Sequence, residues 1–197
     1  MTKLILASGS ASRRSILKGA GVAFEVVRPD TDEAALKAAN PGLDPAELAL
    51  MLAEAKCLDV AKQASGDAVV VGSDQVLEFE GRAYDKPESR EELRDRLMAM
   101  AGKPHFLRGG MVAARGGEVI ERSSSSAELT MRHFTQQELD LYLSEAPDWI
   151  YGTVGGYGLE SSGVRLFDRI EGDYFSILGL DLLSLLPVLR REGVLAW

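Results

Sequence analysis

Cysteine is nearly absent from this sequence, and positive charge is scarce. The single Cys57 excludes a disulfide within the chain, so we expect a reduced, intracellular setting. The 22 Lys and Arg residues are outnumbered by 30 Asp and Glu residues, which gives a net charge of −8. A chain this acidic binds nucleic acid or an anionic membrane surface poorly, so we expect neither as a partner. If the protein binds phosphates, it must gather its few cations locally.

Long apolar segments, linkers and repeats are also missing. No apolar run is long enough to cross a bilayer, and the start of the chain lacks the apolar core of a signal peptide. We therefore expect a cytoplasmic protein. With 46% hydrophobic and 26% charged residues, the composition is typical of a globular protein. We predict a single domain over residues 1–197, large enough to hold two lobes that share a sheet.

Several familiar catalytic motifs do not occur. Neither a phosphate-binding loop nor a dinucleotide-type glycine loop after a strand is present. His105 and His133 are the only histidines, and without a His-Glu-x-x-His motif or paired cysteines they argue against zinc. We expect both to be strand residues with satisfied hydrogen bonds. The absence of Gly-x-Ser-x-Gly argues against a serine hydrolase. Cys57 is interpreted as a small core residue.

The most informative stretch that is present runs from Ala68 to Gln75. Its three valines predict a strand buried on both faces, after which Gly72 and Ser73 are expected to turn the chain outward. Chain leaving the carboxyl end of such a strand commonly forms the ligand crevice of an α/β sheet. Asp74 is therefore the first candidate for chemistry. The alternative is a solvated turn aspartate, because Gly-Ser-Asp is also good turn material.

A second candidate lies near the N-terminus. A short strand over Leu4–Ala7 leads into a hydroxyl-rich loop with Ser8, and Arg13 and Arg14 follow in a predicted helix. Backbone N–H groups at the start of a helix attract anions, and arginines can add bidentate contacts. The alternative is an N-cap serine followed by two solvated arginines.

Two further signals flank a longer helix predicted from Ala46 to about Gln63. The acidic cluster that ends at Glu33 can offer oxygen ligands to Mg²⁺, although such runs are more often solvated loops. Lys56 is expected beside the buried stripe of the helix, where its ammonium would emerge at the edge of a cleft or simply reach solvent past the core. The apolar residues predicted to form this stripe are Leu48, Met51, Leu52, Ala55 and Leu58.

The rest of the chain predicts alternating elements. Lys86 precedes Pro87 and is expected in an extended elbow. Four glycines between 152 and 160 would let the backbone approach a flat ligand closely, and the alternative is an ordinary mobile loop. The other expected elements are a second strand over 22–27, a hairpin turning at 80–81, a helix over 88–100, a hairpin over 104–132 turning at 116–117, a helix capped by Thr135 and Glu138, a strand over 164–170 and a final helix over 176–191.

Taken together, these segments resemble the Maf family of nucleoside triphosphate pyrophosphatases over nearly the whole chain. Each motif alone is weak, but their order and spacing are specific. The motifs that carry the resemblance are Leu6–Arg14, Ala53–Lys56, Val71–Gln75, Lys86-Pro87, Gly102–His105, Gly155–Glu160, Ile170–Phe175 and Gly179-Leu180.

The resemblance implies a fold and an activity. The fold would be α/β, with a mixed, bent central sheet flanked by helices and a nucleotide cleft between two lobes, similar to the inosine triphosphatases. The activity would be hydrolysis between the α and β phosphates of a nucleoside triphosphate, with Mg²⁺ or Mn²⁺ as cofactor. Asp74 would be the catalytic acidic residue and Glu33 the candidate metal ligand. The residues that would contact the phosphates are Ser8, Arg13, Arg14, Lys56 and Lys86. A homodimer is what the family suggests.

The resemblance also bears on the base. Many members carry proline, threonine and glutamine where this chain has Ala11, Gln75 and Glu160, and those members resemble the group that hydrolyses dTTP and UTP. Gln75 and Glu160 resemble the subgroup that acts on 7-methyl-GTP. A carboxylate suits guanine, whose N1–H and N2–H₂ groups both donate hydrogen bonds. Ser12 stands near the place where some of that subgroup carry a bulky aromatic residue, and a serine cannot stack on a methylated base.

Alternative functions of other classes remain open at this stage. One alternative is hydrolysis of dTTP and UTP, and another is hydrolysis of inosine or xanthosine triphosphate, as in the related fold. A third is action mainly by binding, as a nucleotide-gated inhibitor of septum formation. An inactive Asp74 variant that kept a cell-division phenotype would favour binding over hydrolysis, and a panel of substrates would separate the enzymatic alternatives.

Overall fold

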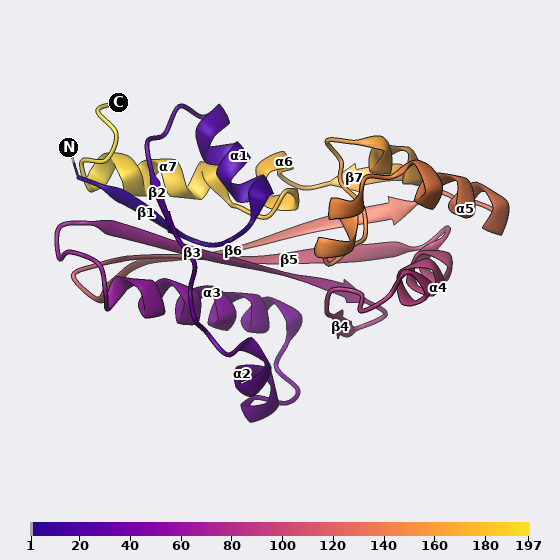
Figure 1. Ribbon diagram of the computed structural model, residues 1–197, viewed down its shortest axis with the longest axis horizontal. Coiled ribbons are helices and arrows are strands. Elements are labelled where there is room, and N and C mark those ends of the chain that lie inside the picture. Colours follow the sequence, from indigo (N-terminus) through magenta and orange to yellow (C-terminus); the bar gives the residue numbers. More distant parts are fainter. Residues whose placement is uncertain (1) are drawn as a thin grey trace. The chain divides into compact units, whose positions relative to one another are not determined.

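A seven-stranded mixed sheet flanked by helices organises residues 2–197, which are the residues that the computed structural model describes (Figure 1). The strand order is β2-β1-β3-β5-β6-β7, and β4 pairs with β3. The elements are β1 Leu4–Ala7, α1 Ala11–Gly19, β2 Glu25–Val27, α2 Glu33–Ala39, α3 Pro45–Ala61, β3 Val69–Phe79, β4 Arg82–Tyr84, α4 Arg90–Met100, β5 Pro104–Arg115, β6 Glu118–Met131, α5 Gln136–Glu145, the 3₁₀ helices η1 Asp148–Gly152 and η2 Ser162–Leu166, β7 Phe167–Glu171, α6 Tyr174–Ile177 and α7 Leu182–Arg191.

The pairing of the strands confirms the predicted α/β class. Strand β1 pairs in parallel with both β2 and β3, and Leu6 lies opposite Val71. Strands β3 and β4 are antiparallel, as are β6 and β7. The hairpin between β3 and β4 turns at Glu80 and Gly81, which both have positive φ, as the favoured two-residue turn requires. No helix among the described residues is long and apolar enough to span a bilayer.

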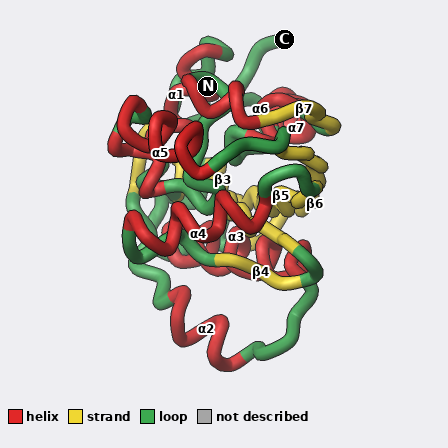
Figure 2. The backbone as a smooth tube through the Cα atoms, turned by 90° about the vertical axis from the view of Figure 1, so that its right-hand side faces the viewer, coloured by secondary structure: helices red, strands yellow, loops and turns green. Residues whose placement is uncertain are grey.

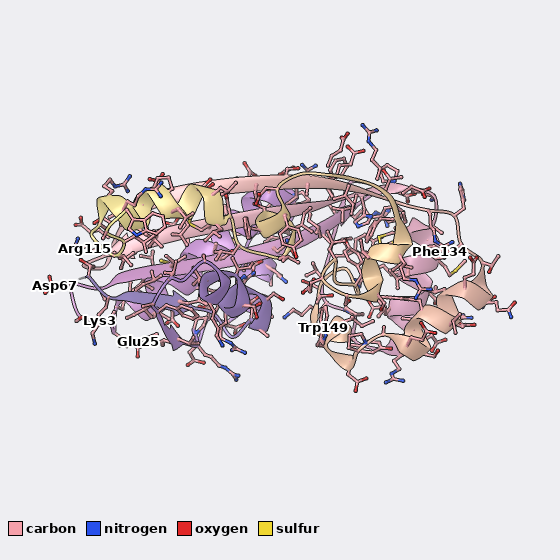
Figure 3. All side chains as sticks on the ribbon, turned by 90° about the horizontal axis from the view of Figure 1, so that it is seen from above. Lys3, Glu25, Asp67, Arg115, Phe134 and Trp149 are labelled. Atoms are coloured by element: carbon pink, nitrogen blue, oxygen red, sulfur yellow. The ribbon has the colours of Figure 1, made fainter. Side chains whose placement is uncertain are left out.

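The chain divides into two compact units. Unit 1 contains the chain up to Gln75, Arg108–Ser126 and Asp173–Trp197, and unit 2 contains Val76–Leu107 and Ala127–Gly172. Strands β3, β5 and β6 contribute residues to both units. Figure 3 labels Lys3 and Glu25 in unit 1, where they form an ion pair of 3.3 Å, and Phe134 and Trp149 in unit 2. The single domain over 1–197, with a cleft between two lobes, stays a prediction.

In unit 1 the sheet has a hydrophobic core on each face, because neighbouring strand residues alternate between the faces. Leu6 and Val71 belong to the core that is covered by α1 and α7. Ile5 and Val70 belong to the core that is covered by α3. Figure 1 shows α3 on one side of these strands and α1 and α7 on the other. The valine run is therefore buried on both faces, as its composition predicts.

The prediction that Gly72 and Ser73 turn the chain is wrong. Strand β3 continues without interruption from Val69 to Phe79, and Ala7 of β1 pairs with Gly72. The glycine serves the packing of a helix instead. A Cβ atom at Gly72 would lie 2.4 Å from the carbonyl oxygen of Ala53 in α3. Gly72 therefore lets the helix approach the sheet closely, and Asp74 sits within a strand and not in a turn.

The buried stripe predicted for α3 is also wrong, except for Leu52. The small residues Ala49, Ala53 and Cys57 face the sheet and are fully buried. Lys56 is largely buried as well, whereas Leu48 and Met51 are only partly buried. Apolar residues surround the whole helix, so helical spacing alone does not identify its inner face. The interpretation of Cys57 as a core residue is confirmed, and burial raises the pKa of its thiol to about 12.

Three smaller expectations also need correction. The second strand is limited to β2, the strand expected from residue 164 begins only at Phe167, and the final helix is split into α6 and α7. The split follows from Gly179, whose φ of 104° is incompatible with a helix. His105 lies in β5, but its Nδ1 is buried without a partner, and His133 follows the end of β6. The prediction of two strand histidines with satisfied hydrogen bonds therefore fails.

Candidate active site

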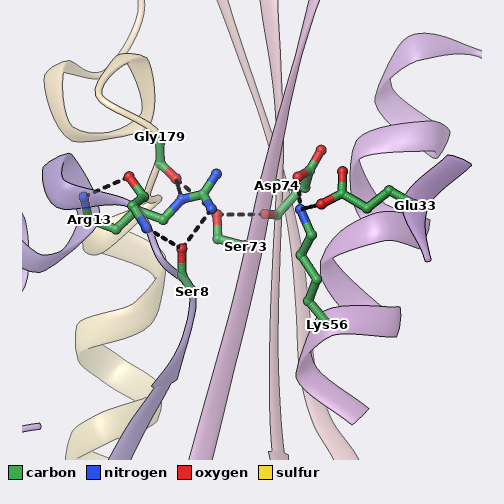
Figure 4. Close-up of polar contacts among 9 residues, drawn as sticks. Ser8, Arg13, Glu33, Lys56, Ser73, Asp74 and Gly179 are labelled. Atoms are coloured by element: carbon green, nitrogen blue, oxygen red, sulfur yellow. Dashed lines mark hydrogen bonds and ion pairs between the residues drawn. The ribbon is translucent and has the colours of Figure 1, made fainter. Parts of the chain in front are cut away.

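Strand β3 places two polar residues on opposite faces of the sheet in unit 1. Ser73 continues the face of Val71, toward α1 and α7, and Asp74 continues the face of Val70, toward α3. Both side chains are buried, with exposures of 1% and 8%. Figure 4 shows a cluster of polar contacts on each side of this strand. Buried polar side chains in an apolar strand need partners, and both residues have them.

On the α3 side, one ammonium group joins two carboxylates. Lys56 Nζ lies 2.5 Å from Asp74 Oδ1 and 2.8 Å from Glu33 Oε1 (Figure 4). Lys56 is 8% exposed, so its aliphatic stem runs through the core before its charge emerges. Glu33 is the first residue of α2, which is N-capped by Asp32. The helix α2 follows β2 in the chain, and Figure 2 shows it below α3.

On the other side, Arg13 of α1 is fixed by two protein acceptors. Its Nε donates to the carbonyl of Gly179 at 2.7 Å, and its Nη1 donates to Ser8 Oγ at 3.1 Å. Ser8 is 4% exposed and also accepts from the amide of Ser10, the N-cap of α1. Burial lowers the pKa of the Arg13 guanidinium, while the negative charges of Asp74 and Glu33 oppose that shift. A guanidinium stays protonated in proteins, so Arg13 is a fixed positive charge.

Ser73 links strand β5 to the Arg13 side of the sheet, and the sequence did not indicate it as a site residue. Its hydroxyl lies 2.9 Å from the carbonyl of Gly110 in β5 and 2.9 Å from that of Gly179. The Gly179 carbonyl thus accepts hydrogen bonds from both Ser73 and Arg13. The available signal was a hydroxyl within an otherwise apolar strand, next to the candidate aspartate. The role of Gly179 depends on a contact between residues 106 positions apart, which no local pattern indicates.

The structure therefore brings Ser8, Arg13, Lys56, Asp74 and Glu33 into one region of unit 1. Three other predicted residues of that unit lie nearby in sequence but have different contacts. Arg14 donates to the carbonyl of Gly9 at 3.2 Å, and Ser12 lies in the first turn of α1, partly buried. Gln75 donates from its amide nitrogen to the carbonyls of Ser176 and Ile177, at 2.9 and 3.1 Å.

Lys86 and Glu160 belong to unit 2, where both are exposed in loops. The glycine-rich segment before Glu160 is packed against the protein's own side chains. A Cβ atom at Gly156 would lie 2.0 Å from Leu93, and one at Gly158 would lie 2.1 Å from Trp149. The idea that these glycines make room for a flat ligand is therefore not needed to explain them.

Arg96 of α4 holds the segments that carry these two residues, and the sequence did not single it out. Its guanidinium donates to the carbonyl of Asp85 at 2.5 Å and to that of Val154 at 3.0 Å. It also forms an ion pair of 2.6 Å with Glu92. Asp85 directly precedes Lys86, and Val154 lies within the glycine-rich segment, directly before Gly155. A buried, forked guanidinium suits this task because it can satisfy several acceptors at once.

A divalent cation fits the α3 side of the region only if a ligand completes its coordination. Among residues 2–197 no group of three or more His, Cys, Asp or Glu side chains could hold a metal ion. Asp74 and Glu33, however, place oxygens within 2.8 Å of the same nitrogen, so both already serve one cation. Mg²⁺ is typically bound by one or two carboxylates together with phosphate and water oxygens. The donor set matches that description.

The chain is similar to known proteins over almost its whole length. The model of a family described as "Maf-like protein" matches residues 3–192. A "nucleoside triphosphate pyrophosphatase" of Maricaulis maris is 43% identical over 195 residues, which cover 99% of either chain. A protein of the same name from Caulobacter vibrioides is 46% identical over 197 residues, with 99% and 98% covered. A "7-methyl-GTP pyrophosphatase" of Rhizobium meliloti is 43% identical over 194 residues, with 98% and 97% covered.

Proposed function

The chain belongs to the Maf-like protein family, and from this premise we propose that it is a nucleoside triphosphate pyrophosphatase. The enzyme would hydrolyse the bond between the α and β phosphates and release a nucleoside monophosphate and pyrophosphate. The observation that carries the proposal is the clustering of Arg13, Lys56, Asp74 and Glu33 around strand β3. Phosphoryl transfer needs little covalent help but strong compensation of charge, and this cluster offers both signs of charge.

Each residue has a distinct proposed task. Arg13 is held by Gly179 and Ser8, so it would offer a positive charge to phosphate oxygens without having to be ordered on binding. Lys56, Arg14 and Lys86 would add further positive charge, and the buried hydroxyl of Ser8 would donate a hydrogen bond. Asp74 would accept the proton of the attacking water. Its Oδ1 contacts Lys56, and its second oxygen would take the proton.

Mg²⁺ or Mn²⁺ is the proposed cofactor, with Asp74 and Glu33 as its protein ligands. Bound there, the ion would neutralise developing negative charge on the phosphates. The shared ammonium of Lys56 supports this role, because it marks a position where both carboxylates already stabilise a cation.

7-methyl-GTP is the proposed preferred substrate, and dTTP and UTP are the alternative. Three relatives about 42% identical to this chain carry the name 7-methyl-GTP pyrophosphatase, which supports the first choice. The side-chain amide of Gln75 donates its N–H groups to two backbone carbonyls, so its carbonyl oxygen is the group that would accept a hydrogen bond from a ligand. An acceptor there, like the carboxylate of Glu160, suits the donors on the guanine edge. Ser12 would contribute no stacking to the base.

The decisive experiment is a substrate panel with the purified protein and Mg²⁺. It compares 7-methyl-GTP, GTP, dTTP, UTP and inosine triphosphate, and detects monophosphate and pyrophosphate separately. We expect pyrophosphate from 7-methyl-GTP at the highest kcat/KM. Comparable or faster turnover of dTTP would overturn the base preference, and release of inorganic phosphate alone would overturn the reaction.

The role of Asp74 is tested with Asp74→Asn. Loss of a general base typically costs on the order of 10²–10⁴-fold in kcat, and the pH–rate profile should lose its acidic limb. The matched control is Asp44→Asn, which makes the same chemical change at the N-cap of α3, where asparagine caps as well as aspartate. A normal pH–rate profile in Asp74→Asn would exclude Asp74 as the proton acceptor.

A further inference from the structure

The ammonium of Lys56 occupies the position between the two carboxylates that the proposed function assigns to the metal. Lys56 Nζ contacts Asp74 at 2.5 Å and Glu33 at 2.8 Å, and its side chain is 10% exposed. A divalent cation that bound the same two oxygens would face this positive charge at very short range. The two cations therefore compete for one pair of carboxylates.

We propose that Lys56 is a built-in competitor that keeps Asp74 and Glu33 from binding a divalent cation while no nucleotide is present. The inference rests on the proposed function, since it concerns the ligands of that site. Binding of the metal would require the ammonium to leave both oxygens. Phosphate oxygens offer it another anionic partner, so the cation would enter together with the phosphates and not before them.

Arg13 and Lys56 are held by different kinds of contact, and this difference supports the proposed movement of Lys56. Arg13 is anchored by hydrogen bonds to the Gly179 carbonyl and the Ser8 hydroxyl, which are both uncharged. The contacts of the Lys56 ammonium are with the two carboxylates. Lysine is a compact charge on a flexible four-carbon stem, so it can exchange one anionic partner for another with little change elsewhere. Arg13 therefore keeps its position when a ligand binds, whereas Lys56 can change its partner.

The charges explain why the competition should be strong. Asp74 has an 11% exposed side chain, so water screens its interaction with Lys56 weakly. Removing the lysine charge leaves two carboxylates with no cation between them. The two carboxylates would then repel each other and attract a divalent cation. The lysine thus lowers metal affinity and at the same time keeps the two carboxylates together.

The test measures binding of Mn²⁺ alone, without nucleotide, by the loss of the free-ion signal in electron paramagnetic resonance. Wild type is compared with Lys56→Met and Lys56→Gln. We expect both variants to bind Mn²⁺ at least about tenfold more tightly than wild type, since the full Coulomb effect of a unit charge at contact is larger still. Lys56→Gln keeps an N–H donor for Asp74, so it covers the case in which the methionine variant does not fold.

The control is Lys62→Met, which removes an exposed lysine at the carboxyl end of the same helix and changes the net charge by the same amount. Its Mn²⁺ affinity should stay within about twofold of wild type, because salt screens an exposed distant charge. Equal or weaker Mn²⁺ binding by a folded Lys56 variant would overturn the inference. The assay needs no turnover, so it gives an answer even if the substrate panel finds no pyrophosphatase activity.

A second readout is the thermal unfolding midpoint with and without Mn²⁺. A ligand that binds only the folded state stabilises it by RT ln(1 + L/Kd), where L is the free ligand concentration, so the midpoint rises once L exceeds Kd. We expect the midpoint of the Lys56 variants to rise with Mn²⁺ at concentrations that leave wild type unchanged. An equal rise in wild type would also contradict the competition.

Discussion

Replacing Gly72 with alanine should push helix α3 away from the sheet and separate Lys56 from Asp74. A Cβ atom at this position would lie 2.4 Å from the carbonyl oxygen of Ala53 and 2.7 Å from the Cβ of Cys57. Ordinary contact needs about 3.5 Å, so the helix must retreat by about 1 Å. The backbone nitrogen of Cys57 would also lie 2.7 Å away. Because the Ala53 oxygen and the Cys57 nitrogen both belong to the helix backbone, no change of rotamer can relieve the clash.

The energetic cost follows from this geometry. Overpacking typically costs about 1–3 kcal/mol, and a backbone clash belongs near the upper end. The φ of Gly72 is not positive, so alanine regains about 0.4–1 kcal/mol by restricting the unfolded chain. The net loss is about 2 kcal/mol. For a chain of this length, that lowers the unfolding midpoint by roughly 4–8 °C.

The functional cost should be larger than the loss of stability suggests. A retreat of about 1 Å would lengthen the 2.5 Å contact between Lys56 and Asp74, and a misplacement of that size can reduce turnover by about 10²-fold. Thermal unfolding and steady-state kinetics on the same preparation measure both effects. Gly110→Ala tests the same idea independently, because its Cβ would lie 2.5 Å from the carbonyl of Ala49 in the same helix.

Two comparisons make the reasoning refutable. Gly19→Ala is the control, since a Cβ there has no atom within 4 Å, and it should leave the midpoint unchanged or slightly higher. The double variant at Gly72 and Gly110 should lose less than the sum of the single losses, because one movement of α3 relieves both clashes. An unchanged midpoint in Gly72→Ala, or fully additive losses, would refute the close helix–sheet contact as the cause.

Two further predictions concern unit 2. Burial lowers the pKa of His105 to about 4, below the value near 6.5 of an unfolded chain, so the unfolded state binds more protons between these pH values. Stability should therefore fall by on the order of 2 kcal/mol between pH 7.5 and pH 5, and denaturant unfolding of His105→Gln should show a smaller fall. Arg96→Met leaves the carbonyls of Asp85 and Val154 without their buried donor and should cost about 2–4 kcal/mol in urea unfolding, with a rise in KM. Arg94→Met removes an exposed ion pair on the same helix and should cost less than about 1 kcal/mol; equal losses in the two arginine variants would contradict the role given to Arg96.

The elements that were predicted correctly are those whose signals are local. The turn at Glu80 and Gly81 and the capping box of Thr135 and Glu138 involve residues one to three positions apart, and both are present. The strand over Leu4–Ala7 is likewise defined by its own short apolar run. In each case the local preference of the residues agrees with the conformation that the fold requires of them.

The inner face of α3 could not be predicted for the opposite reason. Leu48, Met51 and Leu58 lie on one side of the helix and Ala49, Ala53 and Cys57 on another, and hydrophobicity favours the larger side chains. The inner face of α3 is determined by Gly72 and Gly110 in two strands, because these glycines let the helix backbone approach the sheet closely. Only small residues such as Ala49 and Ala53 fit that contact. The same rotation brings Lys56 to the buried face.

The continuation of strand β3 through Ser73 and Asp74 has the largest consequence for the site. A turn would present both side chains to one crevice, whereas a continuous strand directs them to opposite faces. Ser73 then supports the Gly179 carbonyl that holds Arg13, and Asp74 meets Lys56 and Glu33 on the α3 face. The motif around Asp74 indicated where the charged residues gather. It did not indicate that one strand separates a fixed cation from a movable one, and this separation makes Lys56 available to compete with a metal.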